Sequence, residues 1–506
     1  MRLLYPILTP HSAPNSTARR ASCRTLLAAL CVSALAAGLM SGCQNTPVKS
    51  YSQVTFPQQF DYVLPMGEQS DIRAWWQQFR DPVLSRLIED GLQTAPDVRE
   101  ANARIDEARA IAKLANADKG LMVGASGGAT AATGSVDNPL PTNARRPLGM
   151  LGSDWGGSNI DVDGHSYHLG VLASWEPDFF GKKQSDADAA GYAYLATAEK
   201  NHAAQMLVSA NIAQAYFKAR SKEREAAVLK RTEAALVDLR RYAKARFDLG
   251  QGTRYDIDDV EVKLQGIRAK QANLTAERQA NIRQIAVLSG KTPQTFDIPV
   301  SRDNVFKHLP AAPRGYYPSD LLTRRPDIRA KQAQVNALAA RHGSAVADQY
   351  PRFGLDFGAL TGGLSISDNG LSSTGATVGL VNATVSVPLF TNGRIKLNIA
   401  AADARVQAAM AEYDKTLLNA LAEVDNSAQL DAALRRQHTH VQKGVQAAEL
   451  QASHAKKLYN YGRQTFDSMP KARITAQEYE QSLIQNELGQ ALNLVALYNA
   501  LGGGWR

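Results

Sequence analysis

Cys43 is the residue whose surroundings most clearly predict a covalent modification. It follows Ser41 and Gly42, and small residues just before a cysteine suit the peptidase that processes bacterial lipoprotein signals. Upstream, arginines precede an apolar run over 25–40, a pattern typical of a secretory signal peptide. We therefore expect residues 1–42 to be removed and Cys43 to carry a covalent lipid. The alternative is an ordinary signal peptide with a chance cysteine.

The residues around Cys43 also indicate where the lipid would anchor the chain. Gln44, rather than an aspartate, follows the cysteine, which by analogy with bacterial lipoproteins favours transport to the outer membrane. The other two cysteines, Cys23 and Cys31, lie inside the proposed signal. The mature chain would therefore contain no free thiol and no disulfide.

The sequence offers no residue pattern typical of catalysis. It contains no HExxH, GxSxG or CxxC motif. The stretch LSGKT ends like a phosphate-binding loop, but Ile285 stands where such a loop requires a glycine. The histidine pairs in HSYH and HTH are weak metal signals, because two histidines alone do not make a site. We expect no enzyme activity, no bound metal and no cofactor beyond the lipid on Cys43.

The charge balance is mildly basic. The formal net charge is +9, and the proposed signal holds four arginines and no acid, which leaves 9 − 4 = +5 for the mature chain. No dense basic cluster is present, so we expect no nucleic-acid partner. A hydrophobic content of 44% with 21% charged residues is typical of a chain that folds.

An internal repeat organises the rest of the chain. The segments TAPDVREANARI and RRPDIRAKQAQV match at an offset of 230 positions, with Pro96 matching Pro326. Farther along, the offset becomes 212, with Gly250 matching Gly462. The difference, 230 − 212 = 18, predicts extra residues in the first copy. The Gly/Pro/Asn-rich loop expected over 133–165 is where they fit.

Each copy predicts one β-hairpin. Apolar residues alternate with glycine and polar residues at about 120–176 and again at about 352–389, and a period of two indicates strands with unlike faces. Such strands suit a membrane β-barrel. Four strands are too few to enclose a channel, and an open edge in lipid leaves backbone groups unpaired. The chain must therefore oligomerise if its strands lie in a membrane.

Each copy also predicts a very long helical hairpin. Residues 192–249 contain neither glycine nor proline, and their apolar residues follow a three-four spacing typical of coiled-coil packing. Gly250 and Gly252 break this helix, and Gly462 breaks its counterpart. The expected helical hairpins cover 184–289 and 395–501.

Together these parts resemble the TolC-like outer-membrane factors, in their lipoprotein (NodT-type) branch. The resemblance covers nearly the whole mature chain and rests on several segments in order. They are WWQQFRDPVLSRLI, the two PD(V/I)R segments, SWEPDFFGKKQSDADAA, VPLFTNGRIKLNIAAADA and the closing LYNALGGGWR. It implies a mixed all-α and membrane β-barrel fold built as a homotrimer. Four strands per chain would join a twelve-stranded barrel in the outer membrane, and the long helices would form a periplasmic α-barrel.

The resemblance implies a passive function. The trimer would be the exit duct of a tripartite efflux system in a Gram-negative bacterium, lipid-anchored in the outer membrane. It would receive small toxic compounds from a periplasmic adaptor and an inner-membrane transporter. Two alternatives remain open: an outer-membrane channel for protein secretion, and a pore-less periplasmic coiled-coil lipoprotein scaffold. The sequence identifies neither the substrate nor the adaptor.

In the family, aspartates near the periplasmic tip narrow the pore, after the helix-breaking glycine of the second repeat. Here those positions hold Ser468 and Lys471, and the nearest acid is Asp467. In the first copy, three aspartates follow the glycine turn, and we expect Asp258 to be a solvated residue at a helix start.

Our hypothesis is that Asp256, Asp259 and Asp467 line or latch the tip, with Lys471 and Arg463 as partners. Rings of like charge in a trimer would repel one another and attract cations. The alternative is that these aspartates only begin helices, where Asp is favoured by the helix dipole.

The expected domain organisation has five parts. They are a signal peptide (1–42), a lipidated N-terminal extension (43–74), a first repeat (75–290), a linker (291–317) and a second repeat (318–506).

Overall fold

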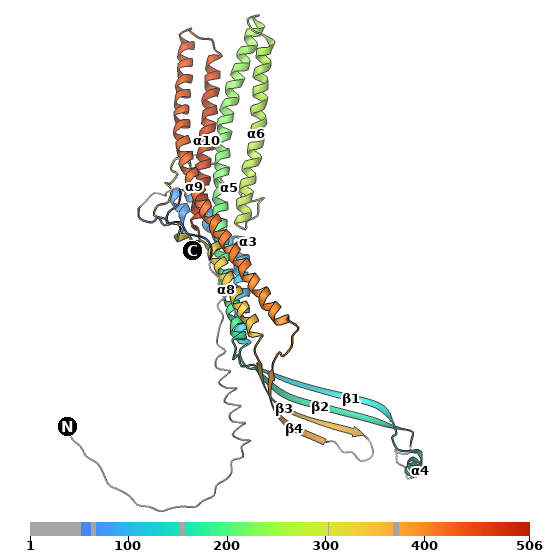
Figure 1. The fold of residues 1–506 in the computed structure, drawn as a ribbon. Coiled ribbons are helices and arrows are strands. Elements are labelled where there is room, and N and C mark those ends of the chain that lie inside the picture. Colours follow the sequence, from blue (N-terminus) through green and yellow to red (C-terminus); the bar gives the residue numbers. More distant parts are fainter. Residues whose placement is uncertain (1–51, 62–66, 151–156, 302, 368–373, 506) are drawn as a thin grey trace, which may run out of the picture. The chain divides into compact units, whose positions relative to one another are not determined.

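The structure is a computed structural model that describes residues 52–61, 67–150, 157–301, 303–367 and 374–505. These residues belong to one compact unit, Val48–Arg506. The proposed signal peptide and Cys43 lie outside the described residues. Figure 1 shows the arrangement of helices and strands.

Apart from η1 and α4 of the first copy, the described helices and strands occur in the same order in both copies. The first copy contains η1 (Trp75–Phe79), α2 (Pro82–Thr94), α3 (Pro96–Ala117), β1 (Met122–Asp137), α4 (Thr142–Met150), β2 (Asn159–Trp175), α5 (Lys182–Asp248) and α6 (Arg254–Leu288). The second contains α7 (Asp320–Arg324), α8 (Pro326–Ala347), β3 (Arg352–Ser367), β4 (Thr374–Ser386), α9 (Arg394–Asn460) and α10 (Ser468–Ala500).

The element bounds confirm the internal repeat. Helices α3 and α8 each have 22 residues, and both begin with a proline followed by an aspartate. Proline suits the first helical turn, and the aspartate favours the positive end of the dipole. Helices α5 and α9 each have 67 residues, and their bounds differ by 212 positions at both ends.

The four strands form one antiparallel sheet in the order β1-β2-β3-β4. Its two faces differ, as the register shows. Phe357 lies opposite Ala173 on one side and Val381 on the other, on an apolar face. Its neighbour Asp356 lies opposite Ser174 and Asn382, on a polar face. Strands β1 and β4 are the edges of the sheet within one chain.

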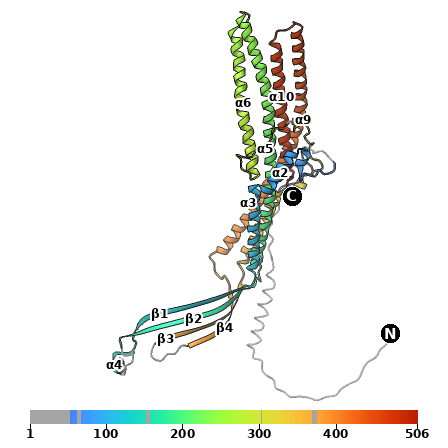
Figure 2. The same cartoon turned by 180° about the vertical axis from the view of Figure 1, so that it is seen from behind.

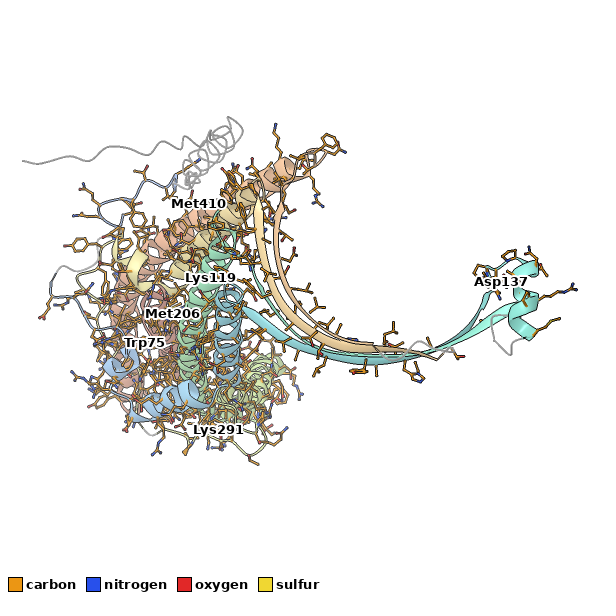
Figure 3. All side chains as sticks on the ribbon, turned by 90° about the horizontal axis from the view of Figure 1, so that it is seen from below. Trp75, Lys119, Asp137, Met206, Lys291 and Met410 are labelled. Carbon is orange, nitrogen blue, oxygen red and sulfur yellow. The ribbon has the colours of Figure 1, made fainter. Side chains whose placement is uncertain are left out.

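The first hairpin differs from the loop expected over 133–165. The strand ladder continues without a break to the pair Asp137 and Asn159, and α4 lies between them. Figure 3 shows these strands as a curved ribbon that leaves the helices near Lys119 and ends near Asp137. The expectation failed because backbone hydrogen bonds hold an antiparallel ladder whether or not its side chains are apolar.

The long helices pack in pairs and in a row. Helices α5 and α6 form one hairpin and α9 and α10 the other, and the two views agree on their arrangement (Figures 1 and 2). Helix α8 packs between α5 and α9, whereas α3 packs on α5. No helix in the described part of the chain combines the length and apolar character needed to cross a membrane.

Helix α5 begins ten residues before the glycine-free stretch that predicted it. It includes Gly191, where an added Cβ would meet nothing within 4 Å. An isolated glycine in a helix costs only about 1 kcal/mol relative to alanine, so the surrounding helix formers override it. The helix begins after Gly181, whose φ of 73° turns the chain out of β2.

The main core lies where the start and end of the described chain meet. Trp75 stacks on Tyr498 with ring centroids 5.4 Å apart, and the Tyr498 hydroxyl donates to Gln78 Oε1 at 2.7 Å. Trp75 and Trp76 are 1% and 0% exposed. Both tryptophans therefore pack inside the protein core.

Candidate functional site

The far ends of the two helical hairpins are closed by equivalent turns. Gly250 has φ of 71° and Gly462 has φ of 66°, a left-handed conformation that glycine adopts without steric cost. In the first turn, the Gly250 N–H donates to the Phe247 carbonyl at 2.9 Å and the Gln251 N–H to the Arg246 carbonyl at 2.8 Å. This bond pair is a Schellman motif, which satisfies the last carbonyls of a helix. The same pair recurs at Gly462.

Gly252 serves the first turn in a different way. Its backbone is not left-handed, but an added Cβ would lie 3.2 Å from the Arg246 Cβ. The turn therefore folds back tightly against the end of α5.

A hollow of about 500 Å³ lies next to these turns, between α5, α6 and α10. Four of the five residues proposed for the gate line it. They are Asp256, Asp259, Asp467 and Lys471. The structure thus brings together acidic residues from both repeats within one chain.

The first of these acids begins a helix. The Thr253 N–H donates to Asp256 Oδ2 at 2.9 Å, and the Asp256 N–H donates to Thr253 Oγ1 at 3.3 Å. This reciprocal pair is a capping box at the start of α6. Hydrogen bonds from the Thr253 backbone and hydroxyl lower the pKa of Asp256 below its usual range. Asp256 therefore lines the hollow and also has the helix-starting role that was the alternative.

The next two acids pair along α6. Lys263 Nζ lies 2.8 Å from Asp259 Oδ2, and Arg254 Nε lies 3.1 Å from Asp258 Oδ1. Both pairs are four residues apart on an exposed helix face, where such pairs contribute only a few tenths of a kcal/mol, about 0.3–0.5. Asp258 does not line the hollow, in agreement with its expected role at the solvated start of a helix.

Asp467 is the most enclosed of the proposed acids. Lys471 Nζ lies 2.8 Å from Asp467 Oδ2, and the Thr465 hydroxyl donates to Oδ1. Partial burial opposes ionisation, but these two hydrogen bonds outweigh it and lower the pKa of Asp467. The carboxylate is therefore ionised at neutral pH and partnered within its own chain.

Arg463 does not join this cluster. Its N–H donates to the Leu458 carbonyl at 2.9 Å in the turn, and its exposed side chain does not line the hollow. The side chain forms no ion pair with a described residue. The partner role expected for Arg463 is thus not found within one chain, because its side chain is exposed to solvent outside the hollow.

Apart from Lys471, the sequence did not single out the basic residues of this hollow. The charged lining residues are Asp256, Asp259, Asp467 and Glu478, with Arg246, Lys263, Lys270 and Lys471. Acids and bases are equal in number, so one chain presents a balanced site and not a ring of one sign. Lys263 could have been found from its spacing after Asp259. Arg246 could not be found in this way, because it lies on α5 whereas Asp256 and Asp259 lie on α6.

Aromatic rings join the two hairpins beside the hollow. Phe466 lies 5.1 Å from Tyr242 of α5 and 5.6 Å from Tyr459 of α9, measured between ring centroids. Among the described residues, no group of three or more His, Cys, Asp or Glu could hold a metal ion. The arrangement holds charged side chains of both signs beside the turns of the two helical hairpins.

Comparisons with known proteins agree with this architecture. The family model described as outer membrane efflux protein matches residues 87–291 and 317–503. The chain is 28% identical over 481 residues to the toluene efflux pump outer membrane protein TtgI of Pseudomonas putida, covering 92% of this chain and 96% of that protein. It is 25% identical to the probable outer membrane lipoprotein SilC of Salmonella typhimurium, covering 92% and 97%.

Among solved structures, the outer-membrane channel OprN matches with a TM-score of 0.75 and 25% identity. The match covers 90% of this chain and 98% of OprN. This likeness confirms the expected fold, in which long helical hairpins continue from the β-sheet of an outer-membrane channel. The chain therefore belongs to the outer membrane efflux protein family.

Proposed function

We propose that three copies of this chain form the outer-membrane exit duct of a tripartite efflux system. The duct passively releases small toxic compounds that a periplasmic adaptor and an inner-membrane transporter deliver to it. The observation that carries this proposal is the four-stranded sheet, which has unlike faces and two open edges and which continues into helical hairpins of 67-residue helices.

The open edges require partners. An unpaired strand edge in lipid leaves N–H and C=O groups without hydrogen bonds, and each such group costs several kcal/mol, about 2–7. Strands β1 and β4 each have one unpaired edge within the chain. Three copies joined edge to edge make a closed sheet of twelve strands, wide enough for an aqueous channel.

The two faces suit lipid on one side and water on the other. The apolar face exposes Leu169, Val171 and Val381 at 63%, 51% and 79%. On the other face, glycines alternate with larger residues such as Leu360 and Leu380. The glycines include Gly124, Gly128, Gly170, Gly354, Gly358 and Gly362. Small side chains on an inward face leave the lumen open, whereas larger ones would fill it.

The relatives favour efflux over the alternatives. TtgI is named for a toluene efflux pump, which supports small-molecule export more than protein secretion or a pore-less scaffold. The duct needs no catalytic residue, because the inner-membrane partner supplies the energy.

We retain the gate hypothesis in a narrower form. Asp259 and Asp467 line the hollow at the end of the tube, and their partners Lys263 and Lys471 can exchange carboxylates when a neighbouring copy approaches. Asp256 contributes its capping box and, through it, the position of Asp259.

We also propose that Cys43 carries a lipid that anchors the N-terminus in the outer membrane. The name of SilC as a probable outer membrane lipoprotein supports this. Mass spectrometry of the mature N-terminus should show acylation in the wild type. Cys43→Ser should retain the uncleaved signal, and an unmodified Cys43 on the mature wild type would refute the proposal.

The test of the duct is single-channel conductance of the purified, lipidated protein in planar bilayers. Wild type should give small, cation-selective steps, and Asp259→Ala and Asp467→Ala should give larger ones. Asp238→Ala, which removes an exposed carboxylate on α5 away from the hollow, is the matched control and should leave the steps unchanged. Folded trimers that conduct nothing in any variant would overturn the duct. Unchanged steps in both tip variants would overturn the gate alone.

A further inference from the structure

Two adjoining hollows lie where α5, α8 and α9 meet the sheet, at the opposite end of the long helices from the hairpin turns (Figure 1). The larger, of about 530 Å³, lies between the start of α5, the end of α8 and the start of α9. The other, of about 490 Å³, lies between the end of α8, the ends of β3 and β4 and the start of α9. Asp348 and Asn398 line both, and we call the two together the junction hollows. Each has a volume typical of small-ligand sites, about 300–1,000 Å³.

Basic residues outnumber acids in the junction hollows. The bases are Lys182, Arg341, Arg352, Arg394 and Arg405, and the acids are Asp186 and Asp348. The difference in one chain is 5 − 2 = +3, whereas the hollow beside the hairpin turns is balanced. The junction hollows therefore concentrate positive charge in a chain that is only mildly basic.

The acid that both hollows share is already occupied. Asp348 Oδ1 accepts from Lys182 Nζ and from Arg352 Nη2, at 2.5 Å each. The other acid, Asp186, is exposed and forms no ion pair with a described residue. The remaining arginines are thus left without a carboxylate of their own chain.

Three arginines of the junction hollows have side chains without a partner. The guanidinium groups of Arg341, Arg394 and Arg405 form no hydrogen bond or ion pair with a described residue. Arg341 of α8 and Arg405 of α9 line the larger hollow together, and both are exposed, so a ligand can reach them. A guanidinium carries its N–H donors in a planar fork that matches the two oxygens of a carboxylate. Two such forks from different helices therefore border one hollow.

Ser344 adds a buried hydroxyl to the larger hollow. It lies three residues after Arg341 on α8, and residues at this spacing are neighbours on a helix face. Ser344 is only 7% exposed and lines the hollow, yet its Oγ forms no hydrogen bond with a described residue. A buried hydroxyl without a partner costs about 1–3 kcal/mol. A carboxylate held by the arginine forks would accept a hydrogen bond from this hydroxyl.

The starts of α5 and α9 strengthen the positive field. Neither helix has an acid in its first turn, and neither has a side-chain cap. They begin instead with Lys182 and Arg394, whereas α3 and α8 carry Asp97 and Asp327 in the first turn. The positive end of the helix dipole favours anions and disfavours cations by about 0.3–1 kcal/mol. Bases placed against this preference are expected where a function requires them.

The rest of the lining is largely apolar. In the larger hollow it consists of Ala189, Ala190, Leu338, Ala345 and Ala402. The other hollow adds Tyr350, whose ring stacks on Phe180 with centroids 4.8 Å apart. An apolar wall beside arginine forks suits an organic acid, which has an apolar body and a carboxylate, better than an inorganic anion.

The junction hollows open on the polar face of the sheet. Arg352 lies four positions before Asp356 on β3, and side chains at even spacing point to the same face of a strand. Ser386, opposite Arg352 in the register, also lines the hollow. This face is the inward one in the proposed duct, so the hollows would border the lumen. Positive charge there raises the local concentration of anions.

We infer that the junction hollows bind small organic carboxylates on their way through the duct. The guanidinium groups of Arg341 and Arg405 hold the carboxylate, Ser344 Oγ donates to it, and the alanines and Leu338 contact the apolar body. The inference rests on the proposed function and adds organic acids as a class of exported compound.

Equilibrium dialysis of benzoate against the full-length, lipidated protein in detergent tests the binding site. Wild type should bind benzoate saturably, and Arg341→Gln/Arg405→Gln should lower the affinity by at least about tenfold, because each fork contributes charge-assisted hydrogen bonds. Arg283→Gln is the matched control and should bind as wild type does. Arg283 is an exposed arginine of α6 that lines neither hollow and forms no ion pair with a described residue.

Two competitors test the chemical class without any substitution. Benzamide, the neutral isostere of benzoate, should not displace it, and inorganic phosphate should displace it only weakly. Displacement by benzamide would show that the arginine forks do not hold the carboxylate. Phosphate competing as well as benzoate would overturn the assignment to organic acids. Absence of saturable benzoate binding to wild type, or equal affinity in Arg341→Gln/Arg405→Gln, would overturn the site.

Reversal potentials in planar bilayers, measured in a gradient of potassium benzoate, test the role in export. The permeability of benzoate relative to potassium should fall severalfold in Arg341→Gln/Arg405→Gln and stay unchanged in Arg283→Gln. Channels that conduct but neither bind benzoate nor change this ratio would overturn the inference and leave the duct intact. Folded protein that binds benzoate but conducts nothing would overturn the duct and, with it, the assignment of organic acids as exported compounds.

Discussion

Lys182 Nζ of the first repeat lies 2.5 Å from Asp348 Oδ1 of the second, across 166 positions of sequence. The pair joins the start of α5 to the end of α8, at the level where the helices give way to the sheet. Arg352 Nη2 approaches the same carboxylate oxygen at 2.5 Å. One carboxylate therefore links the two repeats and the first residue of β3.

Replacing this carboxylate should weaken the chain in a pH-dependent way. Partial burial opposes ionisation of Asp348, but hydrogen bonds from Lys182 and Arg352 outweigh it and lower its pKa. A carboxylate with a lowered folded-state pKa stabilises the fold above its unfolded pKa of about 3.9, and this stabilisation is lost as pH falls. At pH 7, Asp348→Asn should lower the free energy of unfolding by about 1–2 kcal/mol.

Helix unfolding followed by circular dichroism at several pH values checks this expectation. The difference between wild type and Asp348→Asn should be full at pH 7 and should shrink below about pH 4. Asp403→Asn, which removes an exposed carboxylate of α9 bonded only to Gln407, should change little at either pH. A difference that grows on acidification would contradict the assigned pKa direction.

The glycines of the long helices should respond to alanine with opposite signs. Gly462→Ala places a side chain at φ of 66° and should destabilise the turn by about 1–2 kcal/mol. Gly191→Ala lies inside α5 with open space around its Cβ and should stabilise by about 0.5–1 kcal/mol. Thermal midpoints of the two variants, measured in the same detergent, should move in opposite directions. Equal shifts would mean that the turn does not need its left-handed residue.

The C-terminal segment should be intolerant of even one added carbon. Gly504 has φ of 98°, and an added Cβ would lie 2.7 Å from Ser209 Oγ and 2.8 Å from Trp75 Nε1. Gly504→Ala should therefore destabilise by about 2–4 kcal/mol, from backbone strain and overpacking together. Gly379→Ala, in β4 with nothing within 4 Å, is the control. Limited proteolysis at the C-terminus measures this effect. If Gly504→Ala resisted cleavage as well as the wild type does, the C-terminal segment would not pack against Ser209 and Trp75 as described.

The repeat was the most informative feature of the sequence. Matched prolines at Pro96 and Pro326 locate helix starts because proline fits only the first turn of a helix, so the alignment fixed the order of elements in both copies. The coil expected before Asp137 was wrong, since side-chain alternation fades where two strands extend beyond the apolar band while their backbones still pair. Side-chain alternation arises where one face of a strand is buried. It therefore gives little information about strand segments that have no buried face.

The candidate site was predictable only where its geometry is local. Thr253 and Asp256 have the spacing of a capping box, so their hydrogen bonds can be predicted from the sequence. The meeting of Asp467 with the α5–α6 hairpin depends on how two hairpins pack, and no local spacing encodes it. For the same reason, the sequence did not predict that Arg246 of α5 would join the acidic residues in the hollow.

In the proposed trimer, the contact between neighbouring copies should be weakest along the long helical hairpins. Within the chain, Arg231 of α5 and Glu480 of α10 pair at 2.6 Å. Moving each position by the 212-residue offset between the repeats gives Lys443 of one copy and Arg268 of the next. These two residues carry like charges. Arg268 is also bonded to Glu233 of its own chain at 2.9 Å. Lys443→Glu should replace repulsion with attraction and raise the detergent resistance of the trimer, while Lys443→Gln should give an intermediate value. Sensitivity of the Lys443→Glu effect to salt would confirm its electrostatic origin, because exposed pairs are screened within about 10 Å at 0.1 M ionic strength. Equal effects of Lys443→Glu and Lys443→Gln would mean that Lys443 and Arg268 do not face each other. The helices of neighbouring copies would then pack in a different register from α5 and α10 within one chain.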